Sequence, residues 1–128
     1  MPSFYTDNYE IIWLAERYCK IEPRVGILAI IRDICHVFEL KEHQIYDRIN
    51  VHEVSIPRQI AMYVAKQLTG YNDVKIAKSF CRDRTSLYWG VKVVKNMMET
   101  NDERFMWYWR RYVTDSRLYK QNEKSFVF

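Results

Sequence analysis

Residues that interrupt regular structure are scarce in this chain, and that scarcity constrains the fold more than any other feature. Only three glycines and three prolines occur in 128 residues. Apolar side chains recur at helical spacing, and no sustained apolar-polar alternation with a period of two appears. The sequence therefore predicts an all-α protein. Because 48% of its residues are hydrophobic, the chain can bury one sizeable core.

Helix-start signals divide the chain into three parts. Asp7 with Glu10 forms a capping box for a first helix, and Thr100 with Glu103 forms another for the last helix. We expect one central domain with an extra helix at each end. The parts are an N-terminal helical extension over 1–22, the main domain over 23–99, and an aromatic C-terminal helix with a tail over 100–128.

The first half of the main domain is expected to hold three helices. Glu22 and Pro23 suit the start of the first of these helices. A short helical turn follows over 42–46. After a loop over 50–54, Ser55 is expected to cap the next helix.

The second half of the main domain has the spacing of a helix-turn-helix. Asn72 can cap a short helix that ends at Phe80, and after a tight turn Asp83 can cap a longer helix that runs to about Met98. Two helices joined in this way place the second one across a DNA major groove. The spacing therefore favours a DNA-binding protein.

Basic charge is concentrated in the same part of the chain. Residues 55–95 hold eight Lys and Arg against two Asp and Glu, whereas residues 1–54 hold six against nine and residues 96–128 six against five. A local positive excess suits a surface that faces phosphates, because each neutralised phosphate releases condensed counterions. The other interpretation is a solvated, lysine-rich face.

Two motifs in this basic region carry a family resemblance. They read Pro57-Arg58-Gln59-Ile60-Ala61-Met62 and Phe80-Cys81-Arg82-Asp83-Arg84-Thr85-Ser86. They resemble the carboxy-terminal DNA-binding domain of the bacterial replication initiator DnaA. That family has Pro-Arg-Gln-Ile/Met-Ala-Met at one helix start, and Phe-Gly-Gly-Arg-Asp-His-Thr-Thr where the recognition helix begins. The similarity extends from about Val25 to Met98.

The resemblance implies two sets of DNA contacts. Base contacts are expected from the start of the recognition helix, and we add an aromatic residue further along it: Asp83, Arg84, Thr85, Ser86 and Trp89. Contacts to the DNA backbone are expected from Arg58, Gln59, Lys66, Arg82 and Lys92. For Asp83, helix capping and base contact both stay open, since one carboxylate can do both.

The sequence departs from the family pattern at three places. Arg84 stands where the family has histidine, and an arginine can donate two hydrogen bonds to guanine. The turn is one residue shorter, with Cys81 in place of a glycine pair, so a different DNA site is expected. Asn50 stands where the family inserts an arginine into the minor groove. Arg48 and His52 are the alternatives for that contact.

Several function classes are excluded by what the sequence lacks. The family's ATPase module has a phosphate loop that ends in Gly-Lys-Ser or Gly-Lys-Thr, and none of the three glycines here forms one. The histidines and cysteines lack metal-ligand spacing, and no catalytic grouping emerges, so we expect no enzyme, no metal and no cofactor. Without a membrane-span or signal-peptide pattern, a cytoplasmic, nucleoid-associated protein is expected.

The last predicted helix carries more aromatic residues than one buried stripe needs. One interpretation is that a single stripe packs on the domain and the other aromatics lie half exposed. The other is a partner surface, since Trp, Tyr and Arg dominate interface hot spots. Its residues would be Trp107, Tyr108, Arg110 and Arg111, and RNA polymerase or another regulatory protein would be the partner. The tail from Gln121 is expected to fray, although Phe126 and Phe128 are apolar enough to dock on the domain.

The function expected from these patterns is sequence-specific binding of double-stranded DNA. Free-standing relatives of this domain in prophage and gene-transfer clusters resemble transcription regulators, so the chain is expected to regulate transcription or replication. The helix that starts near Thr85 would then lie in the major groove. The alternative is a protein-interaction adaptor that retains the fold but binds DNA weakly or not at all.

Overall fold

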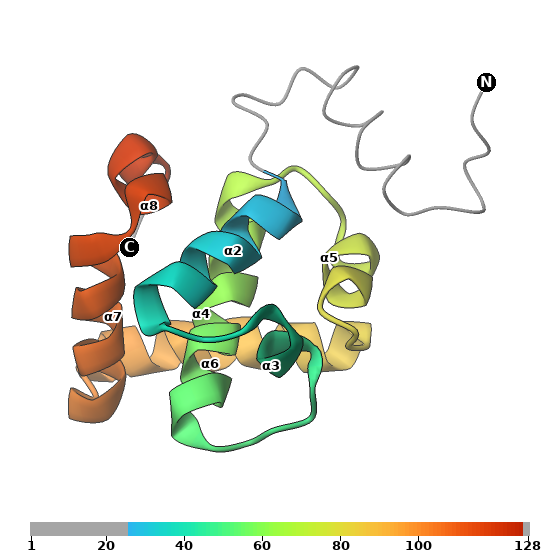
Figure 1. The fold of residues 1–128 in the computed structure, drawn as a ribbon, viewed down its shortest axis with the longest axis horizontal. Helices are drawn as coiled ribbons and strands as arrows, with labels where there is room; N and C mark the ends of the chain where they lie inside the picture. The colour runs from blue at the N-terminus through green and yellow to red at the C-terminus, as the bar shows by residue number, and fades with distance from the viewer. Residues whose placement is uncertain (1–25, 127–128) are drawn as a thin grey trace.

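A computed structural model describes residues 26–126 of the chain. These residues form α-helices and one short 3-10 helix (Figure 1), and the all-α prediction is confirmed for them. None of these helices is long and apolar enough to cross a membrane. The predicted first helix from Asp7 lies outside the described residues. The elements are α2 (Ile27–Phe38), α3 (Glu42–Tyr46), α4 (His52–Leu68), α5 (Asp73–Ser79), α6 (Arg84–Thr100), α7 (Glu103–Asp115), α8 (Arg117–Gln121) and η1 (Glu123–Ser125).

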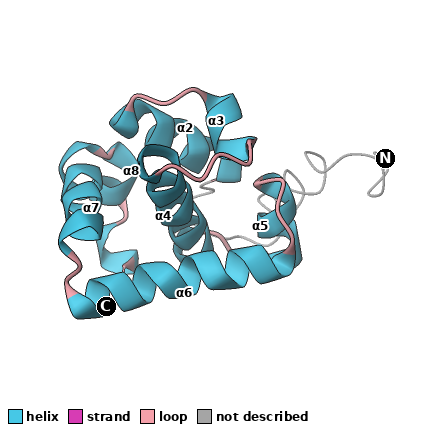
Figure 2. Cartoon of the chain, turned by 90° about the horizontal axis from the view of Figure 1, so that it is seen from below, coloured by secondary structure: helices cyan, strands magenta, loops and turns pink. Residues whose placement is uncertain are grey.

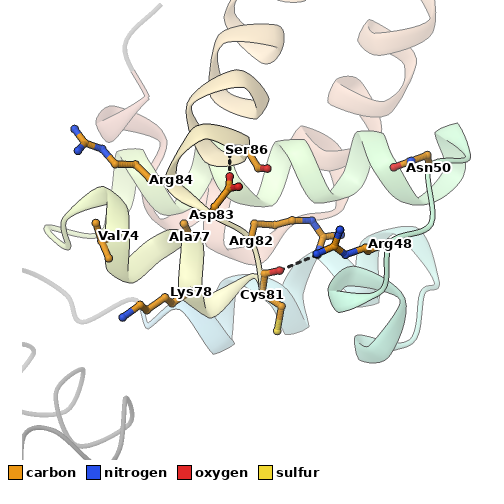
Figure 3. Close-up of a pocket in the computed structure, with 10 residues that line it drawn as sticks. All are labelled: Arg48, Asn50, Val74, Ala77, Lys78, Cys81, Arg82, Asp83, Arg84 and Ser86. Atoms are coloured by element: carbon orange, nitrogen blue, oxygen red, sulfur yellow. Dashed lines mark hydrogen bonds between the residues drawn. The ribbon is translucent and has the colours of Figure 1, made fainter.

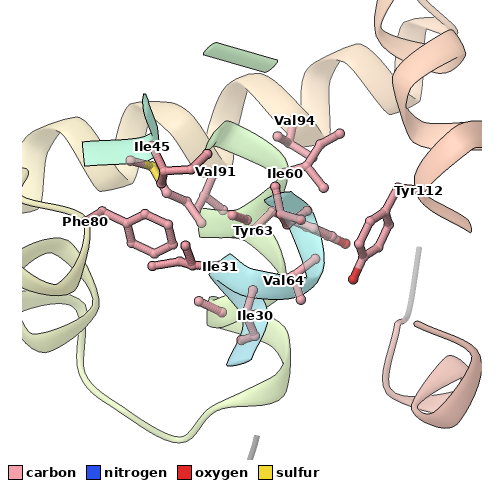
Figure 4. Close-up of a cluster of buried hydrophobic side chains, with 14 of the residues drawn as sticks. Ile30, Ile31, Ile45, Ile60, Tyr63, Val64, Phe80, Val91, Val94 and Tyr112 are labelled. Atoms are coloured by element: carbon pink, nitrogen blue, oxygen red, sulfur yellow. The ribbon is translucent and has the colours of Figure 1, made fainter. Parts of the chain in front are cut away.

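α4 forms the centre of the fold. It contacts α2, α3, α5, α6 and α7, and it buries side chains on most of its circumference, as expected for a helix surrounded by others. Figure 4 shows side chains of α4 meeting those of α2 and α6 in the core. Full burial of one such aliphatic side chain contributes about 1.5–3 kcal/mol. The labelled core residues on these three helices are Ile30, Ile31, Ile60, Tyr63, Val64, Val91 and Val94.

The start of α4 differs from the prediction. The helix begins at His52 after an extended Val51, so Ser55 is an internal residue and not the cap. Val54 explains the extra turn, because its buried side chain joins the interior when this segment is helical. Pro57 lies in the second turn of α4, where it has no amide hydrogen to donate to the Glu53 carbonyl. The start predicted at Glu22 and Pro23 lies outside the described residues, and α2 begins at Ile27.

The helix-turn-helix prediction is confirmed in detail. The Asn72 side chain accepts a hydrogen bond from the Lys75 amide at 2.9 Å and caps α5. Asp83 accepts one from the Ser86 amide at 2.7 Å and caps α6. Figure 2 shows α6 running along one side of the molecule, with α5 near its start and α7 near its end.

One glycine allows α6 to approach α4 closely. A Cβ atom added to Gly90 would lie 3.0 Å from the Met62 sulfur and 3.9 Å from Cγ of Gln59. The first of these distances is tighter than ordinary van der Waals contact. The absence of a side chain at Gly90 therefore leaves room for Met62 between the second helix of the helix-turn-helix and the central helix.

The cap predicted for the last long helix is wrong. Asp102 caps α7 by accepting a hydrogen bond from the Phe105 amide at 3.2 Å. Thr100 is the last residue of α6, and its hydroxyl donates to the Asn96 carbonyl at 2.9 Å. The reason is that Asn101 adopts a left-handed conformation, with φ of 52°, and ends α6 there. A cap for α7 can only come after that residue.

The C-terminal segment folds back onto the domain, and the part of the predicted frayed tail that the structure describes is ordered. α8 and η1 follow α7, and Phe126 is buried 6.3 Å from the Trp109 ring. The Ser116 hydroxyl donates to the Asp33 carboxylate of α2 at 2.5 Å. Burial raises the pKa of Asp33, while this hydrogen bond opposes the shift. An apolar cluster and a polar contact thus fasten the segment.

Candidate nucleic-acid interface

The first turn of α6 is anchored on one side and exposed on the other. Leu87 is fully buried, whereas Arg84, Thr85 and Ser86 are exposed. Hydrogen bonds from the Ser86 amide and hydroxyl, together with the nearby charge of Arg48, lower the pKa of Asp83. Its carboxylate is therefore ionised at neutral pH and caps the helix. The base contacts expected of these four residues remain predictions.

An open groove joins this turn to the loop that precedes α4 (Figure 3). Arg48 and Asn50 come from the loop, and Arg82, Asp83, Arg84 and Ser86 come from the turn and the start of α6. Residues 36 positions apart in sequence thus lie against one hollow. The structure therefore brings two of the three minor-groove candidates together with most of the predicted base-contacting residues.

The third minor-groove candidate lies elsewhere. His52 is exposed at the start of α4, and its Nδ1 accepts a hydrogen bond from the Arg104 guanidinium of α7 at 2.5 Å. It borders a different hollow, formed with Gln59 and residues of α6 and α7. The geometry thus separates His52 from Arg48 and Asn50.

α5 contributes a basic side chain that sequence reasoning missed. Lys78 is exposed and lines the groove, where it projects from the same side as Arg84 in Figure 3. The available signal was its place on the first helix of the helix-turn-helix, which typically crosses the DNA backbone. Lys78 therefore joins the candidate phosphate contacts.

Two arginines expected to contact the DNA backbone are engaged inside the protein. Arg58 is only 5% exposed; its Nε donates to the Ile45 carbonyl at 2.8 Å, and its Nη2 donates to the Gln44 and Asp47 carbonyls. Arg82 is half-buried and donates to the Tyr46 and Asp47 carbonyls. A guanidinium with these partners has few donors left for a phosphate. The geometry argues against the expected backbone contacts of Arg58 and Arg82.

Further along α6, an aromatic pair lies on the exposed face. Tyr88 is 57% and Trp89 54% exposed, and their rings pack edge to face with centroids 5.4 Å apart. The Lys92 ammonium lies 5.2 Å from the Trp89 ring centroid. Tyr88 was missed as a candidate, although the buried stripe of Leu87, Val91 and Val94 leaves position 88 outside the core. Trp89 and Lys92 are accessible as their predicted contacts require.

The remaining backbone candidates are on α4. Gln59 is half-buried and faces α6. The exposed Lys66 forms an ion pair with Asp73 at the start of α5. An exposed pair of this kind is weak, so the ammonium group can exchange its partner for a phosphate.

The predicted partner surface on α7 is divided by the packing. Tyr108 is half-buried, with its ring 5.7 Å from that of Phe38, so it belongs to the contact between α7 and α2. Trp107 is 55% exposed, and together with Arg110 and Arg111 it borders a shallow hollow. The Arg111 guanidinium lies 5.8 Å from the Trp107 ring. The partner surface on α7 stays a prediction.

The described residues contain no cluster of three or more His, Cys, Asp or Glu side chains that could hold a metal ion. Cys35 is buried in α2, and burial raises its pKa to about 11. Its thiol is therefore protonated at neutral pH, which makes it a core residue and a poor nucleophile. Cys81 is exposed in the turn.

Comparison with known proteins agrees with this geometry. The sequence model of the family described as bacterial dnaA protein helix-turn-helix matches residues 27–94, which run from α2 into α6. The chain is similar to chromosomal replication initiator protein DnaA from Sphingopyxis alaskensis, with 32% identity over 91 residues, or 70% of this chain and 20% of the relative. The DnaA proteins of Ehrlichia ruminantium (31% over 80 residues) and Chlamydia pneumoniae (28% over 78 residues) match 62% and 61% of this chain and 17% of their own lengths. The chain thus spans about a fifth of the length of these curated relatives.

Proposed function

Because this chain belongs to the bacterial DnaA helix-turn-helix family, we propose that it binds double-stranded DNA sequence-specifically, with the start of α6 in the major groove. The observation that carries the proposal is the groove of Figure 3. There the exposed first turn of α6 adjoins the loop with Arg48 and Asn50. A helix start and a loop that carries an arginine on one surface can contact adjacent grooves of a duplex.

Each exposed residue of the proposed interface has a chemical task. Arg84 can donate two hydrogen bonds to guanine O6 and N7, and Thr85 offers a methyl group to thymine. Arg48 is proposed for the minor groove. Lys78 and Lys92 are proposed to neutralise phosphates, which position the protein without selecting a sequence. Binding should therefore weaken steeply as salt increases.

The proposed biological role is regulation at a DNA site. The relatives named above are replication initiators, which makes a replication-linked site one candidate. Transcription regulation is the other, with RNA polymerase or another regulatory protein as partner. The two roles differ in the sequence that the protein prefers. A site like that of the initiator favours replication, and an unrelated site favours a regulator with its own promoters.

Variants of α6 test the proposal. Arg84→Ala and Thr85→Ala should reduce the discrimination between a preferred duplex and a single-base variant, by about 1–3 kcal/mol for the arginine. Lys92→Gln should weaken binding to both duplexes about equally and reduce the salt slope by about 1. Fluorescence anisotropy at several salt concentrations measures both quantities. The same loss from all three variants on every duplex would contradict the assignment.

An adaptor role is the second candidate, and the 55% exposure of Trp107 favours it. A large aromatic beside two arginines is typical of a binding hot spot. A pull-down with and without nuclease separates the two functions. A partner that persists after nuclease treatment, together with no duplex retained at low salt, would replace the DNA-binding proposal with the adaptor.

A further inference from the structure

We propose that Arg82 is a positioning residue that holds the loop with Arg48 and Asn50 in a fixed place relative to the first turn of α6. The inference rests on the proposed DNA-binding function and concerns how its two DNA-contacting elements are joined. From the sequence, Arg82 was expected to contact a DNA phosphate. The hydrogen bonds of its guanidinium indicate a different role.

The Arg82 side chain contacts the end of α3. The last carbonyl groups of a helix have no partners within it. Arg82 supplies partners here: its Nη1 donates to the Tyr46 carbonyl at 3.0 Å, and its Nη2 donates to the Asp47 carbonyl at 2.6 Å. The same Asp47 carbonyl accepts from Nη2 of Arg58 at 2.8 Å. Asp47 immediately precedes Arg48, so these bonds lie at the base of the loop. We call the hydrogen bonds of Arg82 to Tyr46 and Asp47 the clamp.

The same side chain also contacts the turn between α5 and α6. Nη1 of Arg82 also contacts the Phe80 and Cys81 carbonyls, at 3.3 and 3.2 Å. The Arg82 amide donates to the Ala77 carbonyl at 2.9 Å, which holds the residue against α5. One side chain thus bonds both the turn that starts α6 and a loop 35 positions earlier in the sequence.

Only arginine fits this arrangement chemically. Its planar fork has five N–H donors, whereas a lysine ammonium is a compact charge with three. The charge is favourable here, since the carboxyl end of a helix carries partial negative charge. Repulsion from Arg82 adds to burial in lowering the pKa of Arg58, and Asp47 opposes it. Arg58 and Arg82 thus lie close together despite their like charges, and both donate hydrogen bonds to carbonyl groups at the end of α3.

A DNA-free measurement tests the clamp itself. The Asp47 amide donates to the His43 carbonyl at 2.9 Å, so its hydrogen exchange reports on the end of α3. Arg82→Lys should accelerate that exchange by about tenfold or more, since local opening becomes easier. The amide of Ile60 in α4 should be unchanged. Unaltered exchange at Asp47 would overturn the proposal, and so would loss of the cooperative thermal transition in this variant, because Arg82 would then support the whole domain.

A double-mutant cycle tests the consequence for DNA. On a selected duplex, Arg48→Ala should reduce the affinity by a factor about fivefold or more smaller in the Arg82→Lys background than in the wild type. The reason is that a misplaced loop no longer brings Arg48 to the DNA. Lys92→Gln with Arg48→Ala is the control pair and should be additive. If Arg82 instead contacted a phosphate, Arg82→Lys would keep the affinity and the salt slope of the wild type. That result, or additivity with Arg48→Ala, would overturn the proposal.

The two experiments separate this inference from the function on which it rests. If the wild type binds no duplex while exchange at Asp47 rises in Arg82→Lys, the DNA-binding function fails and the clamp stands. If the wild type binds and depends on Arg84, while Arg82→Lys changes neither exchange nor coupling, the clamp fails and the function stands.

Discussion

At the scale of single residues, the turn of the helix-turn-helix depends on an unusual backbone. Cys81 has a φ of 55°, in the left-handed region that favours glycine. For other L-amino acids this conformation costs about 1–2 kcal/mol. The family pattern has a glycine pair at this position. The shorter turn of this chain therefore keeps the left-handed conformation without the residue that adopts it most easily.

We expect the stability of Cys81 variants to follow how easily each residue adopts the left-handed backbone conformation. Cys81→Gly should raise the free energy of unfolding by about 0.5–1 kcal/mol, because relief of strain exceeds the added entropy of the unfolded chain. Cys81→Val should lower it, since a β-branched residue fits this region worst. Cys81→Ala is the control and should resemble the wild type. Urea unfolding measures the series, and equal stabilities for glycine and valine would contradict this account.

At the scale of helices, local signals predicted some boundaries and tertiary packing decided others. Asn72 and Asp83 cap α5 and α6 as expected, because a cap depends only on residues two or three positions away. The start of α4 at His52 was missed, since it goes with the burial of Val54, which residue spacing alone does not reveal. The internal bonds of Arg58 and Arg82 were also missed. Their partners in α3 and at its end lie 11 to 36 positions away in sequence, beyond the reach of any local pattern.

The corrected start of α7 gives a direct comparison of two candidate caps. Asp102→Ala should lower the free energy of unfolding by about 0.5–2 kcal/mol, because the Phe105 amide loses its acceptor. Thr100→Ala should have a much smaller effect, since its hydroxyl bonds only within α6. Thermal unfolding of the two variants measures the difference. A larger loss from Thr100→Ala would restore the capping box that the sequence predicted.

At the scale of the whole molecule, α7 and the segment after it lie outside the residues that the family model matches. They are nevertheless part of the folded unit. Trp109 of α7 is buried against Tyr63 of α4, Phe105 and Tyr112 of its own helix, and Phe126 near the chain end. A single packed stripe on α7 was one of the two interpretations of its sequence, but the folding back of residues up to Phe126 depends on contacts that only the structure supplies.

Two tryptophans on α7 test this division between core and surface. Trp109→Ala should cost about 3–5 kcal/mol of stability, as expected for deletion of a large buried ring. Trp107→Ala should change stability by less than about 0.5 kcal/mol, because that side chain is 55% exposed. Chemical denaturation of both variants is the measurement. Similar losses would show that the outer face of α7 also supports the fold.

We propose that the chain selects a DNA sequence through the first turn of α6. Selection of bound duplexes from a random pool, run in parallel with the wild type and Arg84→Ala, tests it most directly. We predict that the wild type enriches a defined motif, and that Arg84→Ala loses the preference at one base pair while keeping the remainder. No enrichment by the wild type, or an identical motif from both proteins, would contradict the account.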